Sequence, residues 1–247
     1  MIKFFRKIRR NLLNEGKTTR YFKYAIGEIL LVVIGILIAL QINNWNENNK
    51  RDVIRQSYYK QLLEDLDKDK IYIENRIIQF DSLIANYNTY LETYKEPNLS
   101  IEQVFININK LGLKSVIMLF NTSTLESLQS TGDIKLIPPT IRNKLIDLKR
   151  GQDLMLKSAE GNDKGKNEIL QNATMEIGSG SLIESLGNQQ ILREFLNLES
   201  KYPNLILLME AAIYWKNLSE TRILTPLKKI LKDNETLAEL ITNELKK

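Results

Sequence analysis

The feature that most constrains this chain is an apolar stretch close to its N-terminus. Residues 25–42 read AIGEILLVVIGILIALQI, and twelve of these eighteen are Ile, Leu or Val. On the membrane-insertion scale the twelve contribute roughly −4 to −7 kcal/mol, whereas Glu28 costs about 2.5–3.5 kcal/mol at mid-membrane and less near a helix end. Because the gain exceeds the cost, the stretch predicts a transmembrane helix over residues 25–45, flanked by the interfacial aromatic residues Tyr24 and Trp45.

The distribution of charge predicts how that helix is oriented. Residues 1–24 carry eight Lys or Arg and one acidic residue, a net charge of +7, whereas the whole chain is only +5. Positive charge before a span holds that end in the cytoplasm. We therefore expect a cytoplasmic tail over 1–24 and a periplasmic domain over 46–247, in the inner membrane. A cleaved signal peptide is the alternative, but the apolar run is longer than a signal core and no A-x-A-like site follows it.

The basic tail has the pattern of an amphipathic helix. In residues 2–13, IKFFRKIRRNLL, apolar residues recur at helical spacing and basic residues fill the remaining positions. Such a helix can lie on anionic lipid headgroups through Lys3, Arg6, Lys7, Arg9 and Arg10. The alternative is that these charges only set the topology. Because the positive charge belongs to this tail and residues 25–247 sum to −2, we expect no nucleic-acid-binding surface.

Two features inside the predicted span suggest contact with a partner. Gly27, Gly35 and Ala39 lie at multiples of four residues, which gives one partly small-residue face for close helix approach. Glu28 is either an ion-pair or proton-relay group in an assembly, or an interfacial carboxylate that reaches water. With Trp45 at the far interface, these residues are the candidate membrane or partner contacts.

The N-terminal segment also resembles a known group of proteins. The run YAIGEILLVVIGILIALQINNWNE, preceded by MIKFFRKIRRNLL, is similar to the N-terminus of a large family of uncharacterised single-span membrane proteins from flavobacteria and other Bacteroidota. Further on, SLQSTGDIKLI at 127–137 resembles the central segment of that family. The resemblance implies a Gram-negative inner-membrane anchor with a periplasmic domain, and it implies no activity or catalytic residue.

Beyond the span the pattern predicts an all-α domain. Apolar residues from Ile54 to Tyr94 recur with a mean step near 3.6, which predicts one long amphipathic helix whose stripe is a core or coiled-coil seam. Whether the span runs continuously into this helix is left open, because several Asn residues lie between them. The fold predicted is an N-terminal transmembrane helix, this long helix, and an irregular antiparallel helical bundle.

Local signals place the boundaries of the later helices. Ser100 with Gln103, and Ser123 with Glu126, read as capping boxes that open two short helices, which end near Gly112 and Gly132. A helix follows Pro139. Residues 158–166, SAEGNDKGK, read as a loop or frayed interruption, and 178–181, GSGS, as a flexible joint. Helices are expected over about 188–201 and after Pro203, with Pro226 kinking or restarting the last one.

The composition narrows the chemistry available to the chain. It contains no Cys and no His, which excludes disulfides, thiol catalysis, histidine general bases and zinc sites built from these residues. The acidic run Glu64, Asp65, Asp67 and Asp69 lacks the spacing of an EF-hand loop and reads as a solvated helix face. We therefore predict no catalytic residue, no cofactor and no metal site.

These observations favour a binding function over a catalytic one. The leading hypothesis is a membrane-anchored periplasmic interaction or scaffold protein that acts on a protein partner or as a homo-oligomer. A periplasmic ligand sensor is the alternative. The 24-residue cytoplasmic tail counts against it, because the tail is too short for an output domain, and a sensor would have to signal through a membrane partner. An enzyme is the third possibility, for which no motif was found.

Overall fold

The computed structural model describes residues 18–246, and these divide into two compact units at Ser57 and Tyr58. Residues 18–246 form helices joined by turns and extended segments, with no β-strand, which confirms the all-α class. The predicted lipid contacts Lys3, Arg6, Lys7, Arg9 and Arg10 lie outside the described residues.

The first helix, α2, spans Thr18–Thr93 without interruption. The polar segment at 43–49 does not break it, which answers the question of continuity that the sequence left open. Within the unit that ends at Ser57, α2 contains an 18-residue window of mean hydropathy 2.6, no part of which is buried by the protein. This helix is a candidate membrane span by its length and composition.

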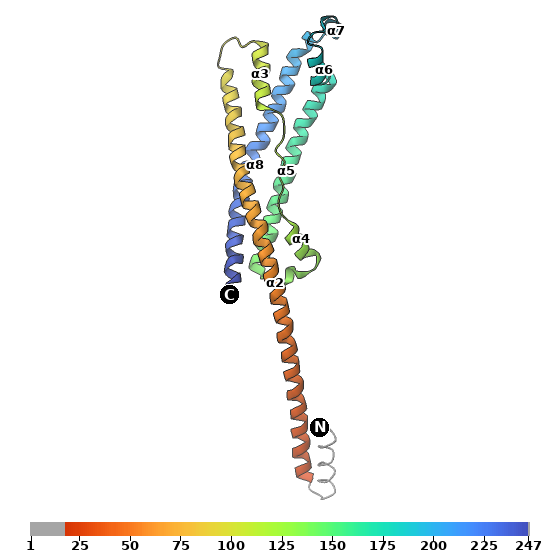
Figure 1. Cartoon of the computed structure of the whole chain (residues 1–247), viewed down its shortest axis with the longest axis vertical. Coiled ribbons are helices and arrows are strands. Elements are labelled where there is room, and N and C mark those ends of the chain that lie inside the picture. Colours follow the sequence, from red (N-terminus) through yellow and green to blue (C-terminus); the bar gives the residue numbers. More distant parts are fainter. Residues whose placement is uncertain (1–17, 247) are drawn as a thin grey trace. The chain divides into compact units, whose positions relative to one another are not determined.

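The unit Tyr58–Lys247 is a bundle built on the second half of α2 and two other long helices. Its remaining elements are α3 (Ile101–Leu111), α4 (Ser123–Ser130), the 3-10 turn η1 (Asp133–Leu136), α5 (Pro139–Ile177), α6 (Gly180–Ser185), α7 (Gln190–Phe195), the 3-10 turn η2 (Glu199–Lys201) and α8 (Tyr202–Leu245). Figure 1 shows α8 running antiparallel to α5, and these two helices pack extensively against each other.

The core follows the predicted stripe of α2 over its middle turns. Leu62, Leu66, Ile73 and Phe80 are buried and pack with apolar residues of α4, α5 and α8 in one cluster. At its end the stripe shifts by one position: Tyr90 is 4% exposed, whereas the predicted residues Leu91 and Tyr94 are 44% and 43% exposed. Steps of seven residues join the buried positions Leu66, Ile73 and Phe80. A seven-residue repeat drifts across the face of a straight α-helix by about 20° per heptad, so the buried row departs from a 3.6-residue stripe towards the end of α2.

The predicted caps are confirmed at one helix and corrected at another. Ser100 caps α3, because its hydroxyl accepts the backbone N–H of Gln103 at 3.2 Å, and Gly112 ends α3 with a φ of 61°. The prediction for α4 was wrong by one residue. The N-cap position is Thr122, whose hydroxyl donates to the Glu126 carboxylate at 2.7 Å.

The predicted interruption at 158–166 was wrong, because α5 is continuous from Pro139 to Ile177. Asn162 and Lys166 continue its buried stripe, so polar residues occupy core positions and hide the period. The GSGS segment is a helix boundary: Gly178, with a φ of 87°, follows the end of α5, and Ser179 caps α6. The helix expected over 188–201 is instead two pieces, α7 and η2, whereas α8 continues through Pro226.

Candidate functional site: a groove between α5 and α8

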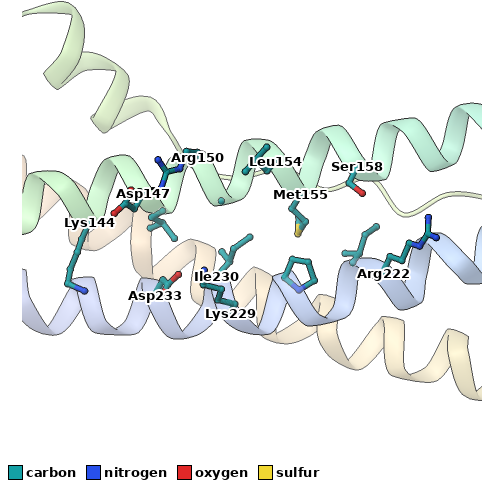
Figure 2. Close-up of a pocket in the computed structure, with 14 residues that line it drawn as sticks. Lys144, Asp147, Arg150, Leu154, Met155, Ser158, Arg222, Lys229, Ile230 and Asp233 are labelled. Atoms are coloured by element: carbon teal, nitrogen blue, oxygen red, sulfur yellow. Dashed lines mark hydrogen bonds and ion pairs between the residues drawn. The ribbon is translucent and has the colours of Figure 1, made fainter.

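A hollow in the bundle, here called the α5–α8 groove, lies between α5 and α8 (Figure 2). Its volume is about 590 Å³, which falls within the range of roughly 300–1,000 Å³ typical of ligand sites. The lining residues are Lys144, Asp147, Leu148, Arg150, Gly151, Leu154, Met155 and Ser158 of α5, and Arg222, Ile223, Pro226, Lys229, Ile230 and Asp233 of α8.

The lining of the groove includes one glycine, Gly151, and one proline, Pro226. Gly151 presents no side chain, and a Cβ built there would meet only Ile230 Cγ1, at 3.9 Å. On α8, Pro226 has no N–H, so the carbonyl of Arg222 loses its intrahelical donor. Both Arg222 and Pro226 line the groove.

The floor of the groove is apolar and its rim is charged. Met155, Ile223 and Ile230 are nearly fully buried at the floor, whereas Leu154 stands at the rim with 64% of its side chain exposed. Among the lining residues, Leu154 is the large apolar side chain that is exposed, so a bound molecule would bury more apolar surface there than at the floor.

The rim carries an excess of positive charge. Four basic residues line the groove against two acidic ones, Asp147 and Asp233. Arg150 already pairs with Asp147 at 2.9 Å, both side chains being exposed. Among residues 18–246, no ion pair engages Lys144, Arg222 or Lys229. The groove thus combines apolar surface with uncompensated cations, a combination that suits an amphipathic anionic group.

A second polar cluster lies inside the bundle, and its role is to join elements. Lys166 of α5 is 2% exposed; its ammonium donates to the Leu113 carbonyl at 3.0 Å and to the Ser115 hydroxyl, and it pairs with Asp163 at 3.4 Å. These contacts tie the extended segment after α3 to α5. Sequence patterns did not indicate these contacts, because Lys166 lies in the segment 158–166 that was predicted to be a loop.

The neighbouring ion pair on α8 is also buried. Lys216 Nζ lies 2.8 Å from Glu220 Oε1, in the geometry of a close ion pair rather than an aligned hydrogen bond. Burial raises the pKa of Glu220, and the nearby ammonium groups of Lys216 and Lys166 partly oppose that shift. Each cation has a nearby carboxylate, so the cluster is compensated and offers no free group for catalysis.

The acidic run on α2 is only in part the solvated face that the sequence suggested: Glu64 and Asp67 are exposed, whereas Asp65 is half-buried and Asp69 is buried. Asp69 is 2% exposed; its carboxylate accepts the backbone N–H and side-chain amide of Asn121 at 2.9 and 2.7 Å, and Gln152 at 3.3 Å. Asp65 accepts the Thr124 hydroxyl at 2.6 Å. These two carboxylates hold the start of α4 against α2. Helical spacing places them on the inward face, a signal obscured by the charged residues between them.

Burial controls the protonation of Asp69 more than its hydrogen bonds do. Desolvation raises the pKa of this carboxyl, whereas the donors from Asn121 and Gln152 lower it by less. No group of three or more Asp or Glu residues within 18–246 is arranged to hold a metal ion. Within the helical unit, Asp65 and Asp69 act as acceptors for protein donors.

The predicted membrane or partner contacts all lie on α2 before Ser57. Gly27 and Gly35 have no atom within 4 Å of a built Cβ, so both positions are open to a close neighbour. Trp45 is 67% exposed. With Glu28 and Ala39 these residues remain predicted contacts, and they are separate from the α5–α8 groove in sequence.

Comparison with known proteins places the chain in a family. A model of the family of unknown function DUF6090 matches residues 28–175, which is more than half of the chain. The chain belongs to this family. The matched segment begins in the apolar part of α2 and ends near the end of α5. The comparisons with curated proteins and with solved structures found no match.

Proposed function

We propose that this DUF6090 member is a membrane-anchored interaction protein of the periplasm, whose helical unit binds a protein partner in the α5–α8 groove. The observation that carries the proposal is the pairing of an apolar floor with the unpaired cations Lys144, Arg222 and Lys229. An acidic amphipathic helix would bury its apolar face on this floor and place its carboxylates against these cations. The role proposed is binding and holding rather than catalysis.

The anchoring part of the proposal rests on the unburied apolar window of α2 and on the basic residues that precede it. We propose that residues 25–45 cross the inner membrane with the N-terminus in the cytoplasm, and that the basic tail contacts anionic headgroups. Protease added to spheroplasts would digest the helical unit in this topology. Full protection of the unit, or recovery of the full-length chain in the soluble fraction, would refute it.

Site-specific photocrosslinking in cells tests the groove. A benzoylphenylalanine in place of Leu154, at the exposed rim, should give a discrete adduct to a partner protein. The matched control is the same residue at Met175, which is 82% exposed on the same helix but outside the groove. Arg222→Glu combined with Lys229→Glu should abolish the adduct at position 154. An adduct that persists in this double variant, or that forms equally from position 175, would contradict the proposal.

A ligand sensor is the second candidate, and the size of the groove favours it. A volume of about 590 Å³ suits a small amphipathic anion as well as a helix. In that case the signal would cross the membrane through a partner of α2, and Glu28→Gln with Gly35→Leu should abolish the response to the ligand while leaving the ligand bound. Loss of binding in that variant would point away from a sensor.

A further inference from the structure

The segment between α3 and α4 is extended and has an unused hydrogen-bonding edge. Residues 113–120, LKSVIMLF, form neither helix nor strand, although Val, Ile and Phe favour strands. Their side chains alternate as in a strand: Met118 is 5% exposed, whereas Ile117 and Leu119 are 72% and 69% exposed. The segment therefore has strand geometry without a strand partner.

One edge of this segment is already occupied by a side chain of α2. The Tyr72 hydroxyl donates to the Ile117 carbonyl at 3.0 Å and accepts the Leu119 N–H at 3.2 Å. In an extended chain the N–H and C=O groups of successive residues point to opposite edges, and those of residues i and i+2 point to the same edge. The backbone N–H and C=O groups of Val116 and Met118 consequently point away from Tyr72. Within residues 18–246, no hydrogen bond engages these backbone groups.

A hollow of about 700 Å³, here called the strand groove, borders these two residues. Val116, Ile117 and Met118 line one side of it, and residues of α5 from Leu156 to Gln171 line the other. Leu156 and Ala159 give that face an apolar start. A groove between an extended edge and a helix is the geometry in which a peptide can bind by adding a strand.

The charges of the strand groove indicate which peptide would fit. Glu160 and Glu168 line it, and neither forms an ion pair within the described part of the chain. Asp163 also lines it and is compensated by the buried Lys166. Lys164 opposes part of this charge. The remaining surface is acidic, in contrast to the basic rim of the α5–α8 groove.

We propose that the strand groove binds an extended, basic segment of a partner protein by strand addition. The partner's backbone pairs with the N–H and C=O groups of Val116 and Met118. Its apolar side chains at alternate positions cover Ile117 and Leu119 as cross-strand neighbours. Its Lys or Arg side chains lie against Glu160 and Glu168. This site is separate from the α5–α8 groove, so α5 would serve two different binding surfaces.

The test uses the full-length protein in detergent and fluorescent peptides of defined chemistry. A Val-Lys alternating heptapeptide, VKVKVKV, should bind saturably. The acidic counterpart VEVEVEV should not bind, and neither should VKVKVKV with every backbone amide N-methylated, which cannot donate a hydrogen bond from either edge. Backbone amides around Val116 and Met118 should exchange more slowly with deuterium when VKVKVKV is bound.

Charge reversal on α5 supplies the matched variants. Glu160→Lys with Glu168→Lys should weaken VKVKVKV binding by about tenfold or more, whereas Glu239→Lys, an exposed acid on α8 outside both grooves, should leave it unchanged. Circular dichroism of each variant confirms that it is folded. The proposal is overturned if VKVKVKV does not bind, if the N-methylated peptide binds equally well, or if Glu239→Lys weakens binding as much as the double variant.

Discussion

Replacing Asp69 by Ala should destabilise the helical unit by about 2–4 kcal/mol. The change removes the acceptor of three hydrogen bonds, from the Asn121 backbone N–H, the Asn121 amide and Gln152. The exposed Asn121 side chain can turn to water, but Gln152 is only 3% exposed and would lose its partner. A buried donor left unpaired costs about 1–3 kcal/mol. Relief of the buried charge offsets part of this loss.

Urea unfolding of the full-length protein in detergent, followed by circular dichroism at 222 nm, measures the effect. Asp67→Ala is the matched control, because Asp67 carries the same charge two residues earlier on α2 but is exposed. The control should change the free energy of unfolding by less than about 0.5 kcal/mol. If the two variants unfolded at the same urea concentration, the structural role assigned to Asp69 would be wrong.

The burial of Asp69 also predicts how the free energy of unfolding changes with pH. Because burial raises the pKa of Asp69 above 3.8, the folded state binds the proton more tightly than the unfolded state does. The contribution of this group to the free energy of unfolding therefore falls as pH rises from about 3.8 through the raised pKa, and is constant above it. Asp69→Asn should remove that fall and cost less stability than Asp69→Ala, because it keeps a side-chain acceptor. A wild-type curve parallel to that of Asp69→Asn would refute this assignment.

Three further changes test the packing. Leu237→Ala should lower the free energy of unfolding in urea by about 2–5 kcal/mol, since Leu237 is 0% exposed. Leu207→Ala is the control and should be nearly neutral, because Leu207 is 68% exposed. Equal losses in the two variants would contradict the core as described. Lys166→Met should cost about 2–3 kcal/mol by leaving the carbonyl that its ammonium contacts without a donor, and the exposed Lys164→Met is its control in thermal unfolding. Gly178→Ala should cost about 1–2 kcal/mol, because the residue has a φ of 87° and its Cβ would lie 2.9 Å from a side-chain carbon of α6; an unchanged melting temperature would show that the turn relaxes freely.

Periodicity predicted α2 well over its middle turns and failed for α5. In α2 the core positions from Leu62 to Phe80 are apolar apart from Asp69, so a 3.6-residue period is visible by inspection. In α5 the core positions include Gln152, Asn162 and Lys166. These residues are polar, so a pattern based on hydrophobicity does not identify them as core positions.

The candidate sites were invisible in the sequence for a related reason. Gly151 and Pro226 are separated by 75 positions, and only the packing of α5 against α8 places them on the same groove. The strand groove likewise needs the extended segment at 116–118 to lie beside α5. Neither groove has a local sequence motif, because each is formed by two elements that are far apart in the sequence and come together only in the folded bundle.

What the sequence determined by itself is the apolar stretch of α2, the helical class and the caps at Ser100 and Gly112, because these depend on residues within one or two turns of each other. What only the tertiary structure decided is which polar residues are buried and which surfaces are hollow. Asp69 and Lys166 became interior residues because donors and acceptors from distant elements replace the water they lose on folding. That exchange is a property of the packed bundle and not of any single segment.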